Sequence, residues 1–273
     1  LFLFGSETQR RTYLPRLGRG AGSAFALGEP SVGSDPAMLK TMAVPSADGA
    51  WYRLNGETLW CTNGPSAEIL LVVALAPPSK SSGHEKPQPT AFLVETSQPG
   101  FEVRHISSLM GIRGVSTGLL CFRNFEVPAS NMVGELGQGL KIAMTTLNIG
   151  RLTLPAALGA LSKLSVHYAR NWCRNRVQWG VPIGRHQAVA LRISRMAAHA
   201  FAMDSISAQV NAMVDKGATD FRIESAMAKY YCCEHAWRIC DALVHVRGGR
   251  GVETAESLAS LGEDPVPAER MLR

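Results

Sequence analysis

The feature that most constrains the fold of this chain is a change of hydrophobic period near residue 137. Between residues 23 and 130 the apolar segments are short, rich in aromatic and β-branched residues, and separated by Gly, Pro, Ser and Asn. Closely spaced strands without helix-length inserts are typical of an antiparallel barrel or sandwich. From Gly137 onward apolar residues recur at helical spacing. The sequence therefore predicts an α+β chain in which a β domain precedes a helical bundle.

Three parts are expected along the chain. Residues 1–22 are interpreted as the end of an N-terminal helical domain, residues 23–130 as a central antiparallel β-barrel domain, and residues 131–273 as an incomplete C-terminal helical bundle. A first bundle helix is expected at roughly 139–172, and two apolar seams define two more helices. The first seam is Val189, Ile193, Met196, Ala200, Met203, Ser207, Val210 and Val214, and the second is Ala226, Tyr230, Cys233, Trp237, Cys240 and Val244.

Composition excludes several classes of protein. Hydrophobic residues make up 46% of the chain and charged residues 18%, which is typical of a globular protein. The longest apolar run, near Ile69–Pro77, is too short to span a membrane. Six cysteines without a C-x-x-C pair indicate buried, reduced thiols, and we expect no metal site. The net charge of +6 permits a phosphorylated ligand. The sequence has no dense run of Lys and Arg of the kind that binds nucleic acid.

Four segments could carry chemistry. Residues 26–35 form a turn rich in Gly and Ser after a strand, and residues 59–64 place a Trp beside a Thr hydroxyl at a strand end. Residues 176–187 combine Arg, Gln and Trp between two helices, and residues 245–251 end a helix in several glycines. Each segment taken singly also fits a structural role: a β-turn, a core Trp, a surface loop and a helix stop.

Taken together, these segments resemble the acyl-CoA dehydrogenase family in order and spacing. FALGEPSVGSD at 25–35 resembles its flavin loop, LNGETLWCTNG at 54–64 its second flavin strand, and residues 110–117 with 125–128 its exit from the β domain. GATDFRIE at 217–224 and the turn before Arg151 resemble most the very-long-chain branch and its bacterial relatives. The resemblance implies an N-terminal helical domain, a central β-barrel and a C-terminal four-helix bundle, the last of these truncated here.

The resemblance also implies FAD as the cofactor and dehydrogenation of an acyl-CoA to a trans-2-enoyl-CoA, with electrons passed to an electron-transfer flavoprotein. Residues implied to line the flavin are Phe25, Leu27, Gly28, Gly33, Ser34, Trp60, Cys61 and Thr62. Residues implied to reach the FAD of a neighbouring subunit, in a homodimer or homotetramer, are Arg176, Gln178, Trp179, His186, Gln187, His245, Gly248 and Gly249. Residues implied to border the acyl-CoA are Ser34, Asn148, Gly150 and Arg151.

Three positions depart from the family pattern. Gly28 stands where the family usually has Thr, and His245 stands where it usually has Gln. The catalytic Glu of the family is expected about nine residues beyond Arg273, and the alternative position for the base aligns with Gly150. We therefore expect no catalytic base within the chain, and no activity of the chain by itself.

Two rival functions remain open at this point. An acyl-CoA oxidase would pass electrons to oxygen, and a non-catalytic family relative would bind DNA or act in assembly. We expect no nucleic-acid partner and no transmembrane segment. The expected location is the cytoplasm of a bacterium or the mitochondrial matrix of a eukaryote.

Overall fold

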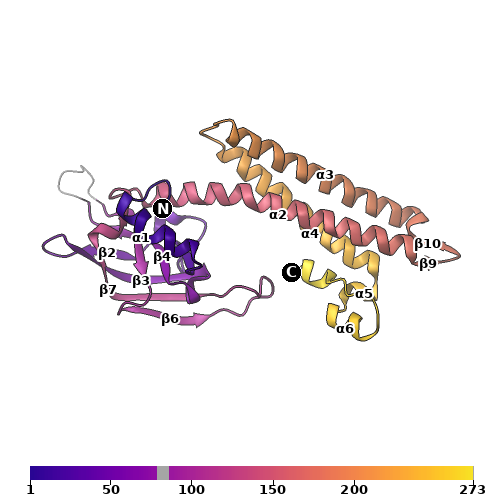
Figure 1. Ribbon diagram of the computed structural model, residues 1–273, viewed down its shortest axis with the longest axis horizontal. Helices are drawn as coiled ribbons and strands as arrows, with labels where there is room; N and C mark the ends of the chain where they lie inside the picture. Colours follow the sequence, from indigo (N-terminus) through magenta and orange to yellow (C-terminus); the bar gives the residue numbers. More distant parts are fainter. Residues whose placement is uncertain (79–85, 273) are drawn as a thin grey trace. The chain divides into compact units, whose positions relative to one another are not determined.

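The computed structural model describes residues 1–78 and 86–272 and divides into two compact units, Leu1–Thr145 and Thr146–Arg273 (Figure 1). Along the chain, the boundary between the two units falls inside the long helix α2, Gly139–Asn175. The expected division into domains at 1–22, 23–130 and 131–273 stays a prediction. The sequence also predicts a polar, mobile loop from Pro77 to Pro89, and this prediction falls largely on residues 79–85, outside the described residues.

The first unit begins with helix α1, Glu7–Gly18. A capping box starts it: the Ser6 hydroxyl accepts from the Gln9 backbone N–H at 3.2 Å, and the Gln9 side chain accepts from the Ser6 N–H at 3.0 Å. The buried Gln9 amide also donates to the carbonyls of Ser130 and Met132. The helix expected in the N-terminal segment is confirmed, and its first turn is tied to the β region.

Among the described residues, eight strands form one mixed sheet in the order β6-β7-β3-β2-β4-β5-β8, with β1 paired to β4. Their bounds are β1 Ser23–Ala26, β2 Met42–Pro45, β3 Trp51–Thr62, β4 Ile69–Ala76, β5 Gln88–Glu95, β6 Phe101–Ile106, β7 Thr117–Pro128 and β8 Met132–Val133. Short 3-10 turns lie at Pro36–Met38, Gly64–Ser66 and Ala129–Asn131. The α+β class, with a β region before a helical region, is confirmed.

The sheet departs from the predicted antiparallel arrangement at two of its strand pairings. β1 and β2 both run parallel to β4, whereas the other pairings of the sheet are antiparallel. The order of strands also runs from β6 at one end to β8 at the other. Hydrophobic alternation locates strands but carries no information on their direction, which depends on the strands that pair in the folded chain.

Strand β4 lies at the centre of the unit and is buried along most of its length. Leu70 and Val72 belong to one apolar cluster, and Ile69 and Val73 belong to another that also contains Tyr13 of α1. A strand that is covered on both faces reads as a continuous apolar run rather than an alternating one. This is the reason for the ILLVVALA sequence of β4.

The second unit is helical (Figure 1). It contains the rest of α2, then α3 Gln187–Asp215, α4 Arg222–Arg247, α5 Gly249–Val252, α6 Ala255–Ser260 and α7 Ala268–Leu272. A hairpin of two short strands, β9 Val177–Gln178 and β10 Val181–Pro182, and a 3-10 turn at Ile183–Arg185 connect α2 to α3. The seam predicted on α3 is confirmed, because Met196, Ala200, Met203, Ser207 and Val210 are its buried residues.

The seam predicted on α4 is wrong at Ala226, Tyr230 and Trp237, which are exposed, and is confirmed at Cys240, which is buried. The buried face of α4 consists mainly of small or aliphatic residues, whereas the predicted seam residues Tyr230 and Trp237 are 69% and 59% exposed. Both faces of this helix are apolar, so periodicity alone could not choose between them. Small side chains such as Ala228 and Ala236 let α4 pack closely in the interior, and the large rings stay outside.

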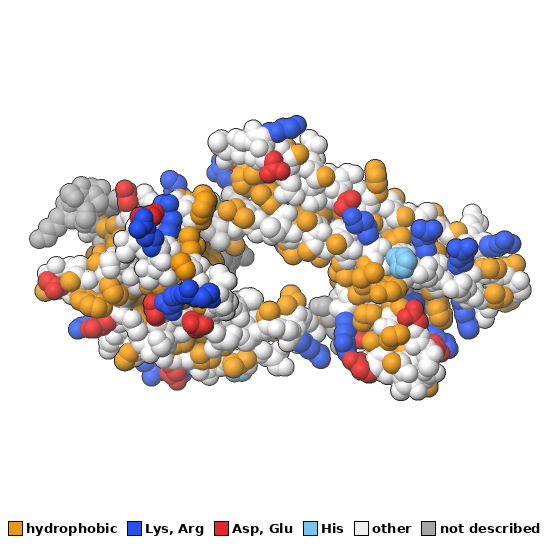
Figure 2. Space-filling view, in the orientation of Figure 1, with side chains coloured by type: hydrophobic (Ala, Val, Ile, Leu, Met, Phe, Trp, Pro, Cys, Tyr) orange, Lys and Arg blue, Asp and Glu red, His pale blue; other side chains and the backbone are white. Residues whose placement is uncertain are grey.

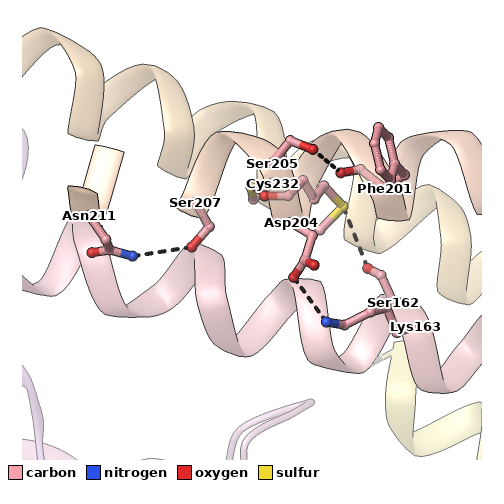
Figure 3. A network of polar contacts seen from close by, with 9 residues as sticks. Ser162, Lys163, Phe201, Asp204, Ser205, Ser207, Asn211 and Cys232 are labelled. Atoms are coloured by element: carbon pink, nitrogen blue, oxygen red, sulfur yellow. Dashed lines mark hydrogen bonds and ion pairs between the residues drawn. The ribbon is translucent and has the colours of Figure 1, made fainter. Parts of the chain in front are cut away.

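Polar contacts join the helices of this unit across their packed faces (Figure 3). The Lys163 ammonium of α2 lies 2.9 Å from Asp204 of α3. Ser162 donates to the sulfur of Met203 at 3.6 Å, and the Cys232 thiol of α4 lies 3.9 Å from the Met203 carbonyl. These contacts fix how α2, α3 and α4 lie against one another within the unit.

All six cysteines are free, and five of them are buried. Burial raises the pKa of the Cys61, Cys173 and Cys232 thiols to about 11, which keeps them protonated at neutral pH. The prediction of buried thiols is confirmed for all but Cys233, which is half-buried. Among residues 1–78 and 86–272 there is neither a helix that could cross a membrane nor a His/Cys/Asp/Glu group suited to a metal ion.

Candidate functional site

In the first unit the two predicted flavin segments lie side by side. The backbone N–H of Leu59 donates to the Gly28 carbonyl at 3.0 Å, and the Cys61 thiol donates to the Phe25 carbonyl at 3.4 Å. These bonds join the turn after β1 to the end of β3, although about 30 residues separate them in the sequence. The tertiary structure thus assembles one surface from two separate motifs.

Glu29 holds the turn after β1 in place. Its carboxylate is buried and accepts hydrogen bonds from the backbone N–H groups of Lys40 at 3.0 Å and Thr41 at 2.7 Å. Its backbone pairs in both directions with Val32, which closes the turn. The sequence analysis assigned no role to Glu29. A carboxylate between an apolar strand and a Pro-Ser turn was the signal that could have identified it.

Gly28 and Gly33 serve this turn in different ways. A Cβ built on Gly28 would lie 3.2 Å from the Leu59 carbonyl oxygen, so a larger residue would push the turn away from β3. No heavy atom lies within 4 Å of a Cβ built on Gly33, and Gly33 and the neighbouring Ser34 are exposed. The turn is therefore anchored at its start and open at its end, where a ligand can approach the backbone.

Trp60 sits in an irregular stretch of β3. The pairing of β3 with β7 shifts register between Thr58 and Cys61, and Trp60 has a φ of 61°, in the left-handed region. Such bulges re-aim side chains, and a left-handed non-glycine residue costs about 1–3 kcal/mol. The result is an indole that is 63% exposed at a rigid strand end, two residues before the exposed Thr62.

Three of the other predicted flavin residues, Phe25, Leu27 and Cys61, are buried or half-buried. Cys61 is buried, and its thiol donates inward to Phe25, so only its backbone can face a ligand. Phe25 and Leu27 are half-buried against the apolar cluster that contains Tyr13. The exposed members of the set are Gly33, Ser34, Trp60 and Thr62.

In the second unit, residues 176–187 form a compact hairpin. Trp179 and Gly180 occupy the turn with φ values of 50° and 78°. The Trp179 ring is exposed and stands edge-on to the His186 ring, with the ring centroids 5.4 Å apart. A His186 ring nitrogen lies 3.2 Å from the Gln178 carbonyl, and Gln187 is exposed at the start of α3. The hairpin thus presents polar and aromatic groups together.

The segment that ends α4 lies close to this hairpin. The indole N–H of Trp172 on α2 donates to the Val246 carbonyl at 3.1 Å, and the Arg176 guanidinium lies 6.0 Å from the Trp172 ring. Gly248 has a φ of 62°, and no heavy atom lies within 4 Å of a Cβ built on Gly248 or on Gly249. The structure therefore brings two more predicted segments together.

His245 and three of the predicted acyl-CoA residues, Asn148, Gly150 and Arg151, occupy other positions of this unit. A His245 ring nitrogen lies 3.6 Å from Asp241, one turn earlier on α4. On α2, the Arg151 guanidinium donates to the Asn148 side-chain oxygen at 2.9 Å, while Gly150 is exposed. Asn148 therefore orients the guanidinium of Arg151.

Two family models match the chain, and between them they cover most of it. The acyl-CoA dehydrogenase middle domain matches residues 24–125, and the acyl-CoA dehydrogenase C-terminal domain matches residues 137–271. The butyryl-CoA dehydrogenase of Megasphaera elsdenii superposes with a TM-score of 0.87 at 30% identity, over 99% of this chain and 67% of that one. The chain belongs to the acyl-CoA dehydrogenase family.

Other members of the family are also similar. The protein named "Probable acyl-CoA dehydrogenase FadE10" from Mycobacterium tuberculosis is 47% identical over 273 residues, all of this chain and 42% of that protein. The human mitochondrial very long-chain specific acyl-CoA dehydrogenase is 38% identical over 253 residues, which are 92% of this chain and 39% of that protein. An acyl-CoA dehydrogenase complexed with FAD from Bacillus anthracis superposes with a TM-score of 0.85 at 29% identity, over 99% of this chain and 47% of that one.

These comparisons confirm the resemblance drawn from the sequence. The chain spans about two fifths of the length of these curated relatives. Both matched family domains lie in the order expected, with the β region first.

Proposed function

We propose that the protein containing this chain is an FAD-dependent acyl-CoA dehydrogenase that oxidises an acyl-CoA thioester to a trans-2-enoyl-CoA. Family membership supports the reaction class, and the open surface at Gly33, Ser34, Trp60 and Thr62 supports a planar cofactor. The observation that carries the proposal is the strained, exposed Trp60 beside this turn. Strain of this kind is kept where it positions a functional group.

The residues of the first unit fit a flavin in chemical terms. An exposed indole on a strand end offers a flat apolar face for a ring, and the Thr62 hydroxyl beside it offers one hydrogen bond. The open backbone at Gly33 and Ser34 can donate N–H groups to the edge of the ring or to the thioester. When bound, FAD would supply the redox chemistry by accepting the hydride. The role of the chain is to hold and orient the reactants.

The catalytic base is proposed to lie outside residues 1–273. Three carboxylates near the end of the chain are weak substitutes, because each already has a partner. Glu253 accepts from the Ser257 hydroxyl at 2.8 Å, Glu256 pairs with Arg270, and Glu263 pairs with Arg250. Hydrogen bonding lowers the pKa of the Glu256 and Glu263 carboxyls, whereas a general base at neutral pH needs a raised one.

We further propose that the protein is a homodimer or homotetramer. Helix α4 carries an exposed apolar stripe at Ile223, Met227, Tyr230 and Trp237, spaced four, three and seven residues apart. Figure 2 shows hydrophobic side chains gathered over the helical unit. A second copy of the chain would remove this surface from water. Light scattering of the purified protein tests this proposal, and a strictly monomeric protein with bound flavin would refute it.

Spectroscopy and turnover test the main proposal. The natural gene product that contains this chain is purified, its absorption spectrum is recorded with and without added FAD, and it is assayed with acyl-CoAs of increasing length and an artificial electron acceptor. We expect a yellow protein and bleaching of the flavin bands by substrate. A protein that stays colourless after incubation with FAD would contradict the proposal.

The physiological electron acceptor is proposed to be an electron-transfer flavoprotein. Oxygen is the competing acceptor, because an acyl-CoA oxidase would have the same cofactor and substrate. Turnover under air with and without an electron-transfer flavoprotein separates the two. Stoichiometric release of hydrogen peroxide in its absence would assign the oxidase activity instead.

A further inference from the structure

Three aromatic rings meet between α3 and α4 in the second unit. The imidazole rings of His199 on α3 and His235 on α4 are stacked, with their centroids 3.9 Å apart and their planes at 18°. Tyr231, one turn before His235, has its ring centroid 4.1 Å from the His235 ring and its hydroxyl 3.2 Å from His199 Nδ1. All three residues are half-buried. Two titratable imidazoles therefore share one small, partly dehydrated space.

The stacked arrangement does not suit a metal ion. The nitrogen lone pairs of an imidazole lie in the plane of its ring, so two nearly parallel rings cannot direct theirs at one ion. Among residues 1–78 and 86–272, no group of His, Cys, Asp and Glu could hold a metal ion. The species to which this group can respond is the proton.

The two imidazoles differ in their hydrogen bonds. A hydroxyl both accepts and donates, so the Tyr231 hydroxyl can donate to neutral His199 and accept from its Nδ1–H after protonation. The Nδ1 of His235 is buried and makes no hydrogen bond within the part of the chain that the structure describes. Protonation would turn this nitrogen into a buried N–H donor without an acceptor, which is costly. A proton is therefore better accommodated on His199 than on His235.

The charges around His235 also oppose its protonation. Burial, then His199 and Arg238, lower the pKa of His235 below its ordinary value, and Glu234 acts in the other direction. Glu234 already pairs with Arg238, with 3.7 Å between the charged atoms. His199 is the contribution of α3, the two charged residues belong to α4, and none of these groups comes from α2. Two imidazolium rings at the observed separation would repel each other strongly.

We propose that His199, Tyr231 and His235 form a proton-sensitive contact between α3 and α4, which holds one proton on His199 and separates when a second proton reaches His235. A single positive charge is tolerated, because an aromatic ring attracts a cation over its face. A second proton places two like charges in contact and leaves an N–H unsatisfied, which drives the helices apart. Cys232 and Ala236, next in sequence to Tyr231 and His235, belong to the apolar interior of the unit. Acid therefore exposes this interior locally.

The direction of the pH effect follows from linkage. The pKa of His235 is lower in the folded chain than its ordinary 6.5, so below about pH 6.5 the unfolded chain binds more protons than the folded one. The contact therefore contributes its full stability above this pH and loses it as pH falls. Between about pH 7.5 and about pH 5.5, one group of this kind can weaken the contact by at most about 10-fold.

Amide hydrogen exchange of the natural gene product that contains this chain tests the proposal. Peptides from α3 and α4 are followed by mass spectrometry at about pH 7.5 and about pH 5.5, with correction for the intrinsic effect of pH on exchange. We expect acid to reduce the protection of residues 196–203 and 231–239 by about 3- to 10-fold more in the natural protein than in His235→Phe, which keeps a ring but takes no proton.

His167→Gln is the matched control, because it removes an exposed imidazole of α2 outside this group, and it should respond to acid as the natural protein does. An acid response of His235→Phe equal to that of the natural protein would overturn the proposal. Loss of the response in His167→Gln would overturn it as well.

A second measurement needs no phenylalanine at position 235. Deuterium exchange at the imidazole C2 position, read by mass spectrometry, reports the protonation of each histidine in the natural protein. As pH falls, protonation should reach His199 before His235. Tyr231→Phe, which removes only the hydroxyl partner of His199, should reduce this difference. Simultaneous protonation of the two rings, or protonation of His235 first, would overturn the proposal.

Discussion

The candidate surfaces of the two units are built in opposite ways. In the first unit the surface around Trp60 is shaped by the backbone: a register shift, a left-handed residue and an open glycine, with few charges. In the second unit the surface around Trp172 is made by side-chain charge, with three arginines on one ring. A backbone-shaped site depends on local stability and little on salt, whereas a site made of charges depends on ionic strength. The two candidate surfaces should therefore respond differently to salt.

The largest effect is expected at Glu29, on which the backbone-shaped site depends. Glu29→Gln should lower the free energy of unfolding by about 2–3 kcal/mol, because it removes the charge that strengthens the hydrogen bonds from the Lys40 and Thr41 N–H groups and replaces the oxygen Oε2, which accepts from Lys40, by an amide NH2. Urea unfolding of the whole protein measures this. Glu126→Gln, at an exposed pair with Arg53, is the control and should cost less than about 1 kcal/mol. Equal effects of the two substitutions would show that Glu29 does not hold the turn.

The next effect separates the two surfaces by salt. Arg176→Gln should weaken FAD binding by about 10-fold at low ionic strength and by less at high salt, because its contribution is electrostatic. Thr62→Val, on the backbone-shaped surface, should keep the full salt dependence of the natural protein. Fluorescence titration with FAD over a range of NaCl concentrations measures both. The contrast between the units fails if the salt dependence of Thr62→Val changes as much as that of Arg176→Gln.

A smaller effect concerns the strain at Trp60. Trp60→Gly and Trp60→Ala both remove the indole, but only glycine relaxes the left-handed backbone. The glycine variant should therefore be more stable than the alanine variant by about 1 kcal/mol. Thermal unfolding of the flavin-free proteins compares them. If alanine is tolerated as well as glycine, the backbone at Trp60 is not strained.

A modest pH effect is expected at Glu263. Its hydrogen bonds with Arg250 lower the pKa of the carboxyl below its ordinary 4.5. A carboxyl whose pKa is lower in the folded state adds stability above the unfolded pKa and loses it as pH falls through the folded pKa. The natural protein should therefore lose more stability than Glu263→Gln when acidified below about pH 4.5. Thermal midpoints across the acidic range test this, and parallel pH profiles would contradict it.

The smallest effect is expected at Glu256. This carboxylate pairs with Arg270 at the surface, and the pairing helps to lower its pKa. If it is not the catalytic base, Glu256→Gln should keep kcat within about 2-fold. Steady-state assay with acyl-CoA and an artificial acceptor measures the change. A loss of several orders of magnitude would place the base within this chain.

Much of the architecture followed from local pattern. The change of period near residue 137, the helix at the N-terminus and the buried seam of α3 are properties of single segments, and the structure confirms them. Family membership followed from several motifs in one order, and the comparisons confirm it. Such features are readable because the spacing of apolar residues reflects the helix and strand periods directly. The roles of the individual site residues stay predictions.

Other features depended on tertiary contacts. The parallel pairing of β1 and β2 with β4, the outward rings of α4 and the inward thiol of Cys61 each depend on which neighbour a segment meets. Glu29 anchors the turn after β1 only because the backbone N–H groups of residues 40 and 41 lie against its carboxylate. Arg247 contacts an aromatic ring because α2 brings Trp172 next to the end of α4. The sequence by itself determined where helices and strands form and to which family the chain belongs. The tertiary structure alone decided which of two apolar faces is buried and which charges lack a partner, because burial and pairing depend on residues distant in the chain.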